Sequence, residues 1–383
     1  MALVRRHEAD DTRAIAQKLR DVDWPVAVLP MVLVAIGAAE LFSVGGASFE
    51  PWAGTHVIRF AACYALFIAV ALVDIRVWMR VAFPIYALAL GALVAVELAG
   101  VTYGGATRWL SVGDFNLQPS ELMKVALVLA LARVYQGLDA RTVSRPKNLV
   151  LPGALIALPM LLVAAEPDLG TAVLVMVTGA MMLLAAGVHW LYFFGAGLAA
   201  ATAAPFAWSA LHAYQKARIL TFLDPERDPL GAGYHIIQAK IALGSGGSFG
   251  RGFGQGTQSH LDFVPEKHTD FIFTMLGEEF GFAGSLAIIG LYLALALLGL
   301  RIATRVENRF GRLVAAGVCM TLFAYVFVNI AMVTGLLPVV GVPLPLVSHG
   351  GTVMLSVMFG LGLLMSAHVH RHVNMPRPLA RRR

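Results

Sequence analysis

The sequence predicts an all-α polytopic membrane protein with about ten transmembrane helices. Apolar residues make up 58% of the 383-residue chain and charged residues only 14%, and the mean hydropathy is +0.74. This balance lies outside the usual range of soluble globular proteins. Many apolar runs also reach about 18 residues, which is the length a helix needs to cross a hydrocarbon core of roughly 30 Å. The bilayer is therefore the expected solvent of this chain.

Ten apolar windows between charged, Pro and Gly breaks are the predicted spans. They cover residues 26–44, 56–73, 80–100, 119–137, 149–165, 169–187, 190–211, 281–300, 312–334 and 346–367. The chain is thus divided into an N-terminal tail at 1–24, a membrane domain at 25–370 and a basic C-terminal tail at 371–383. Because the number of spans is even, both termini are expected on one side of the membrane.

The distribution of Lys and Arg predicts which side that is. Twenty of the 29 basic residues lie in the two tails and in the loops on their face, and seven lie on the opposite face. Basic loops stay in the cytoplasm, so both termini are expected there. The long loop at 212–280 is then extracytoplasmic, and it holds most of the polar residues of that face. Its apolar patches, such as 235–243, favour amphipathic helices near the membrane surface.

The polar end of this loop is the first candidate for chemistry. Segment 261–273 places three carboxylates, a lysine and a histidine beside the eighth span. Asp270 lies where water gives way to hydrocarbon, and a partly desolvated carboxylate there suits a general base. Asp is equally a favoured helix N-cap, so a structural role is the alternative. The spacing of His260, Asp262, His268 and Asp270 matches no metal motif, so no metal site built from protein ligands alone is expected.

Two further polar sets are expected on the same face. Arg108 could pair with a pyrophosphate, and Trp109 could lie in an interfacial aromatic belt or stack on a sugar. Glu121 and Lys124 are three residues apart and therefore share one helix face, where an ion pair lowers the cost of burying either charge. That pair is either functional or purely structural.

Three Gly- and Pro-containing segments have structural explanations. The stretch 244–256 matches no nucleotide-binding pattern in any register, and a flexible lid or a tight turn explains its glycines better than a diphosphate cradle. Residues 166–171 and 343–352 use Pro and Gly to set turns. Packing is the better explanation for both segments.

Taken together, these segments resemble the SEDS family (shape, elongation, division and sporulation) over nearly the whole chain. The motifs are G-A-x-R-W-L at 105–110, Q-P-S-E-L-x-K at 118–124, E-P-D-L-G-T at 166–171, P-E-K-H-T-D-F-I-F at 265–273 and P-L-V-S-H-G-G-T at 345–352. His349 departs from the tyrosine more usual in the family, and little consequence is expected. The short N-terminal tail and the ending at 365–371 look more like the elongation branch, RodA, than the division branch, FtsW.

The resemblance implies a peptidoglycan glycosyltransferase that polymerises lipid II during cell elongation, with undecaprenyl pyrophosphate as leaving group. It implies that Asp270 is the catalytic acid/base and that Asp262 is functionally sensitive. The candidate substrate-binding residues are Arg108, Trp109, Glu121, Lys124, Arg218, Lys240, Asp262, Glu266, Lys267, His268 and Thr269.

The same resemblance sets expectations for cofactors, partners and location. The expected cofactor is at most Mg²⁺ or Mn²⁺ bound with the substrate diphosphate. The expected partners are a class B penicillin-binding protein and the elongation machinery, and no nucleic acid. The expected location is the bacterial inner membrane. The Gly- and Ala-rich seventh span, around 195–204, is the candidate for a mobile gate.

Two other classes of function compete with catalysis. A transporter that flips lipid II would also carry polar residues inside its bundle, but its charges should gather near the bilayer midplane. A scaffold for the penicillin-binding protein is compatible with catalysis, yet it would not explain Asp270 beside Lys267 and His268.

Overall fold

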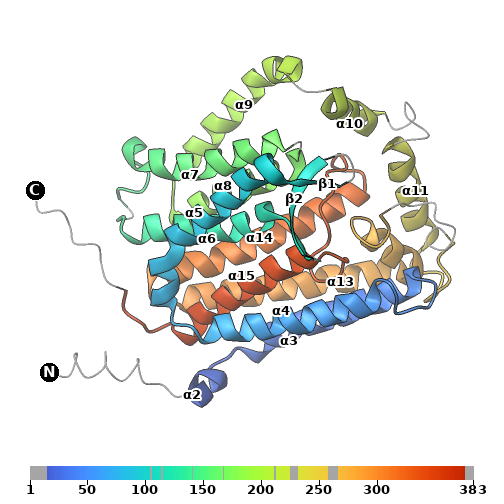
Figure 1. Ribbon diagram of the computed structural model, residues 1–383, viewed down its shortest axis with the longest axis horizontal. Helices are drawn as coiled ribbons and strands as arrows, with labels where there is room; N and C mark the ends of the chain where they lie inside the picture. The colour runs from blue at the N-terminus through green and yellow to red at the C-terminus, as the bar shows by residue number, and fades with distance from the viewer. Residues whose placement is uncertain are drawn as a thin grey trace, which may run out of the picture.

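In the computed structural model, the chain folds into a bundle of long helices (Figure 1). The structure describes residues 15–103, 106–113, 115–139, 141–166, 168–210, 213–224, 232–257 and 266–375. The short α2 (Ile15–Arg20) precedes the bundle. Ten helices correspond to the ten predicted spans: α3 (Trp24–Val44), α4 (Ala53–Leu72), α5 (Ile75–Ala99), α6 (Pro119–Gln136), α7 (Pro146–Ala165), α8 (Leu169–Ala186), α9 (Trp190–Ala210), α13 (Ile272–Arg305), α14 (Arg309–Val333) and α15 (Gly351–Val369).

Eight of these helices are long and apolar enough, within the described residues, to cross a membrane. The exceptions are α6, which carries Glu121, Lys124 and Arg133, and α9, whose apolar stretch Trp190–Phe206 is shorter. The polar residues of α6 are compatible with a span because that helix lies inside the bundle, where most of its side chains are buried.

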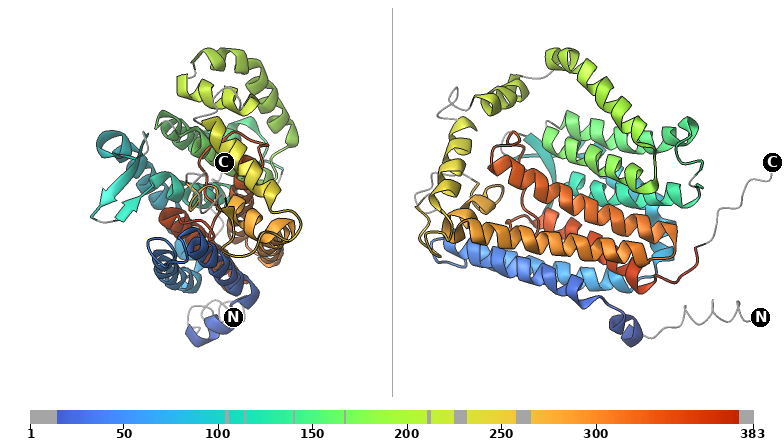
Figure 2. Two further views of the ribbon diagram at one scale, coloured as in Figure 1. Left: turned by 90° about the vertical axis from the view of Figure 1, so that its right-hand side faces the viewer. Right: turned by 180° about the vertical axis from the view of Figure 1, so that it is seen from behind.

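The centre of the bundle is formed by α6, α14 and α15. In α15, 83% of the apolar window is buried, against 17% in α7. Helix α15 packs on α4, α14 and α6, whereas α9 rises away from the other helices and leads into α10 (Ala213–Leu223) and α11 (Ala232–Ser245) (Figures 1 and 2). The helix expected around 235–243 is therefore confirmed as α11.

A small antiparallel sheet stands where only a loop was expected. Its strands are β1 (Val101–Tyr103), β2 (Ala106–Val112) and β3 (Phe115–Leu117), in the order β1-β2-β3. Val101 pairs with Trp109, and Leu110 pairs with Leu117. Strands β1 and β3 have only three residues each, and the sequence of β2, A-T-R-W-L-S-V, does not alternate strictly between apolar and polar residues, which is why the sequence did not reveal them. The sheet gives Arg108 and Trp109 a fixed backbone.

Three predicted spans begin five or more residues away from the predicted position, and one of them is α5, which begins at Ile75 rather than 80. Helix α13 begins at Ile272 rather than 281, and its backbone breaks at Gly281, with φ 68° and ψ −163°. This conformation is open to glycine and strained for other residues. Helix α15 begins at Gly351 rather than 346. The prolines at 343 and 345 keep the preceding backbone extended.

The glycine-rich stretch 246–257 is fastened along α13 on both sides of that break. The amides of Arg251 and Gly252 donate to the carbonyls of residues 278 and 279, at 3.0 Å each. The carboxylates of Glu278 and Glu279 accept from the amides of Thr257 (2.8 Å) and Gly254 (3.1 Å). These backbone amides already donate hydrogen bonds to α13, which favours the tight-turn interpretation over a diphosphate cradle.

Close contacts between backbones place the loop at 335–350 across one end of the bundle. A Cβ atom at Gly37 would lie 2.6 Å from the carbonyl oxygen of Val347, and one at Gly170 would lie 2.6 Å from that of Val340. Glycine at both positions therefore lets the loop lie directly on α3 and α8. This loop forms one wall of the site described next.

Candidate active site

A polar cavity of about 300 Å³ opens at the end of the bundle where β2, the first turns of α6, α8 and α15, and the segment before α13 converge. Its lining includes Arg108, Trp109, Glu266, His268, Thr269 and Asp270, all of them candidates from the sequence. Gln118, Asp168, His349 and the turn at 350–353 complete much of the wall. Helix α2 and the last turn of α15 lie toward the opposite end of the bundle (Figure 1).

Asp270 lies half-buried on the cavity wall. Its carbonyl oxygen accepts a hydrogen bond from Asn329 Nδ2 at 2.9 Å, and its Oδ2 lies 3.4 Å from the position of a Cβ at Gly341. The N-cap residue of α13 is Phe271, so Asp270 lies one residue before the N-cap position. Asp270 lines the cavity.

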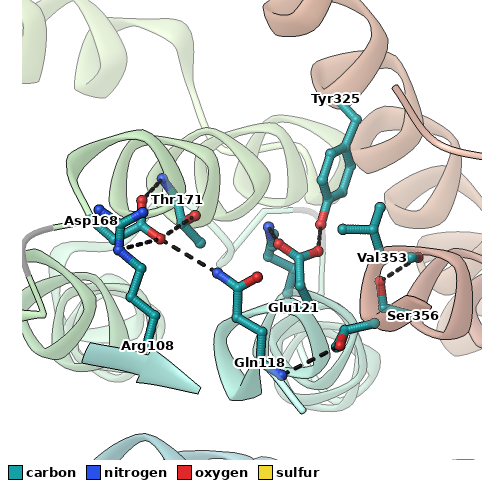
Figure 3. Close-up of polar contacts among 10 residues, drawn as sticks. Arg108, Gln118, Glu121, Asp168, Thr171, Tyr325, Val353 and Ser356 are labelled. Carbon is teal, nitrogen blue, oxygen red and sulfur yellow. Dashed lines mark hydrogen bonds and ion pairs between the residues drawn. The ribbon is translucent and has the colours of Figure 1, made fainter. Parts of the chain in front are cut away.

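An arginine and an aspartate of the cavity lining form an ion pair (Figure 3). Arg108 Nε lies 3.6 Å from Asp168 Oδ2, and Gln118 Nε2 donates to the same oxygen at 3.4 Å. Asp168 also caps α8, because it accepts from the amide of Thr171 at 3.1 Å and from its hydroxyl at 2.9 Å. Asp168 thus holds Arg108 at the cavity. The explanation of segment 166–171 by packing alone missed this contribution.

Glu166 lies behind this pair in the turn between α7 and α8. It is 3% exposed, and its Oε1 has no hydrogen-bond partner among the described residues. Burial, followed by the nearby charges of Asp168 and Glu97, raises the pKa of Glu166 to about 8, and Arg108 opposes this shift. The carboxyl group of Glu166 is therefore mostly protonated near pH 7, and Asp168 is a charged partner of Arg108.

Aromatic and imidazole rings form the third side of the cavity. The rings of Trp52 and His268 stack with centroids 4.6 Å apart, and Arg59 Nη1 lies 3.1 Å from His349 Nε2. Burial, and next the charge of Arg59, lowers the pKa of His349 to about 4. The neutral imidazole can accept a hydrogen bond from the guanidinium. His349 is therefore part of the cavity wall.

The predicted ion pair in α6 is confirmed but lies in a different cavity. Lys124 Nζ is 2.7 Å from Glu121 Oε1, and the two side chains are 1% and 4% exposed. The hydroxyl of Tyr325 donates to the other carboxylate oxygen of Glu121 (Figure 3). Together they line a pocket of about 20 Å³, which is room for about one water molecule. These two candidates do not line the Asp270 cavity.

The remaining sequence candidates lie around the cavity or outside the described residues. Lys240 lies against the loop after α14, where its Nζ is 2.7 Å from the position of a Cβ at Gly335. Lys267 precedes His268 but is not part of the cavity lining. Arg218 belongs to α10, and Asp262 falls outside the part of the chain that the structure describes.

Fold and site define a polytopic membrane protein with a carboxylate, an arginine and aromatic rings around a polar cavity at one end of its bundle. Comparison with known proteins gives the family. The family model "Cell cycle protein" (FtsW, RodA, SpoVE) matches residues 26–373. The chain belongs to this family.

Individual relatives agree with the family model. The chain is 48% identical over 353 residues to "Peptidoglycan glycosyltransferase MrdB" of Escherichia coli strain K12, covering 91% of this chain and 94% of that protein.

Two solved structures are also similar. One comes from "Structural coordination of polymerization and crosslinking by a peptidoglycan synthase complex", with TM-score 0.79, 30% identity, and 92% and 99% of the two chains covered. The other is the rod shape determining protein RodA of Thermus thermophilus, with TM-score 0.70, 26% identity, and 92% and 98% covered.

Proposed function

We propose that this chain is a peptidoglycan glycosyltransferase that polymerises lipid II into glycan strands during cell elongation. The observation that carries the proposal is that Asp270 and Arg108 line one and the same cavity. Similarity to MrdB, which is named a peptidoglycan glycosyltransferase, and to a RodA supports the reaction and the elongation branch.

The reaction needs one base and one group that stabilises negative charge. Asp270 takes the proton from the 4-hydroxyl of the acceptor GlcNAc as this oxygen attacks the anomeric carbon of the lipid-linked MurNAc. A positioned base of this kind contributes about 10²- to 10⁴-fold. The bond to the diphosphate breaks, and undecaprenyl pyrophosphate leaves.

Arg108 is the best-placed group for the diphosphate. Its guanidinium lies on the cavity wall, where it is oriented by Asp168, and a fixed cation stabilises charge that develops on a leaving group. Arg59 reaches the same region through His349. We further propose that any divalent ion, Mg²⁺ or Mn²⁺, is brought by the substrate diphosphate. The described residues contain no group of three or more His, Cys, Asp or Glu side chains able to hold a metal ion.

Helix α9 is the candidate gate for the isoprenoid chain. Among its residues whose burial is described, Phe193 is half-buried and the others are exposed. Large apolar side chains such as Phe194 and Phe206 face outward from it. A helix held by few contacts can move away from the bundle at low cost and open a lipid-accessible groove.

We propose a bacterial inner-membrane location with both termini in the cytoplasm. The excess of Lys and Arg in the tails supports this orientation. So does the position of the cavity, which lies at the end of the bundle away from α2. A class B penicillin-binding protein is the proposed membrane partner. The similar chain from a complex that coordinates polymerization and crosslinking supports this partner.

Purified chain and purified lipid II test the proposal directly. Incubation of the full chain, alone and with its partner, should yield glycan strands that are resolved by length on a gel. A flippase or a scaffold would give no polymer in the absence of another transferase. Transport of lipid II across vesicles without any polymer would replace the proposed function with the flippase alternative.

A further inference from the structure

Three successive main-chain carbonyl groups of the segment before α13 are held by donors from other elements. The carbonyl oxygens at 268, 269 and 270 accept hydrogen bonds from the backbone amide of His349 at 2.9 Å, the hydroxyl of Ser348 at 2.6 Å and the side-chain amide of Asn329 at 2.9 Å. Asn329 belongs to α14, whereas Ser348 and His349 precede α15. The backbone that carries Asp270 is therefore tied to two separate parts of the bundle.

The two side-chain donors are themselves fixed. Asn329 is 0% exposed and Ser348 is 2% exposed. The second bond of Asn329 Nδ2 goes to the carbonyl of Val342 at 2.6 Å, and the hydroxyl of Ser348 accepts from the amide of Leu344 at 2.8 Å. Each side chain thus joins the segment at 268–270 to the loop at 335–350, which forms the neighbouring wall of the cavity.

These bonds act on the main chain rather than on the carboxylate. They can therefore orient Asp270 without taking up its oxygens. Proton transfer and displacement at the anomeric carbon both need reacting atoms held within a few tenths of an ångström, and a displacement of about 1 Å can lower a rate about 10²-fold. A buried, doubly bonded donor is suited to such precision because it has few alternative conformations.

We propose that Ser348 and Asn329 are positioning residues for glycosyl transfer, which hold the main chain at 268–270 and thereby the carboxylate of Asp270. The inference rests on the proposed function, because it requires Asp270 to be the base. It also gives segment 345–352 a role in the reaction in addition to packing.

A matched pair of serines separates positioning from stability. Ser366, near the other end of α15, is 0% exposed, and its hydroxyl donates to the carbonyl of Val73 at 2.7 Å. Ser348→Ala and Ser366→Ala each remove one buried hydroxyl bonded to a main-chain carbonyl of another segment. Both variants should lose thermal stability, and Ser348→Ala should lose more because the buried amide of Leu344 also loses its acceptor.

The assay is the initial rate of lipid II polymerisation by the purified full chain at several substrate concentrations. Ser348→Ala should lower kcat about 10- to 100-fold with KM unchanged, because orientation matters in the transition state. Ser366→Ala should keep kcat within about twofold of the native value. Asn329→Leu, which loses both donated bonds at nearly constant volume, should resemble Ser348→Ala and provides the test if that variant does not fold.

Equal kcat for Ser348→Ala and Ser366→Ala would overturn the inference. Asp270→Asn serves as the reference. If Asp270→Asn is inactive while Ser348→Ala and Asn329→Leu polymerise normally, the positioning inference is wrong and the assignment of Asp270 as the base stands. Normal polymer from Asp270→Asn would overturn the proposed base and this inference together.

Discussion

Replacing Lys124 with Met tests what the buried charges of α6 do for the bundle. In the native chain the ammonium is 2.7 Å from the Glu121 carboxylate, and both side chains are almost fully buried. The ammonium also lies 4.4 Å from the centre of the Tyr325 ring. Removal of Lys124 alone leaves Glu121 with a buried negative charge and the hydroxyl of Tyr325 as its remaining neutral partner.

The expected cost follows from that burial. Removing one partner of a buried ion pair costs about 3–5 kcal/mol, because the charge of the other partner stays buried without an opposite charge beside it. Lost cation–π attraction to Tyr325 adds about 0.5–2 kcal/mol. The double variant Glu121→Gln/Lys124→Met carries no charge, and Gln can still accept from Tyr325. Replacing a buried pair by neutral groups of similar volume is often neutral or stabilising.

Thermal unfolding of the purified protein in detergent, followed by intrinsic fluorescence, measures both variants. We expect Lys124→Met to unfold at a clearly lower temperature than the native chain, and the double variant to recover most of the difference. If the double variant is as unstable as Lys124→Met, buried charge is not the cause of the loss. If both variants are stable but inactive, the pair acts on substrate.

Three further predictions concern the cavity and the topology. The pKa of Glu166 is raised to about 8. As the pH rises from about 4.5 to 8, this group should therefore lower the free energy of unfolding by about 1.4 kcal/mol for each pH unit. Glu166→Gln should remove that slope from thermal midpoints measured against pH, and an unchanged slope would contradict the assignment. Arg108→Ala should slow polymerisation of lipid II about 10²- to 10³-fold, and a near-native rate would exclude Arg108 as the diphosphate clamp. Cysteines replacing Arg5 or Arg381 should be shielded from impermeant thiol reagents in intact cells, whereas one replacing Asp228 should react; labelling of all three would refute the topology.

Much of the fold follows from periodicity and composition, because each predicted span is a long apolar run. All ten predicted spans correspond to helices. The misses occur where local sequence is weakly informative. The strand that carries Arg108 does not alternate strictly between apolar and polar residues, and its two neighbours have only three residues each. Helix α13 begins at Ile272, before the predicted start at 281, and the break in its backbone at Gly281 is not revealed by sequence patterns.

The candidate site was predictable only in part, for a geometric reason. Asp270, His268 and Glu266 could be grouped because they are neighbours in sequence. Asp168 and His349 lie more than 70 residues away from Asp270 in the chain, and each sits in a turn whose Pro and Gly already had a structural explanation. Their convergence depends on how α8 and α15 pack. The buried pair Glu121 and Lys124 was singled out because it places charge in a span, and the structure places it in a pocket other than the Asp270 cavity.

Polymerisation of purified lipid II by purified Asp270→Asn tests the central claim most directly. Asn is nearly isosteric with Asp and keeps the main chain that Asn329 holds, so the variant should fold and keep its thermal midpoint. If Asp270 is the base, polymer should form at least about 10²-fold more slowly than with the native chain. Asp270→Glu should polymerise far more slowly than the native chain although it keeps a carboxylate, because one added methylene displaces that carboxylate. Polymer from Asp270→Asn at the native rate would contradict the account.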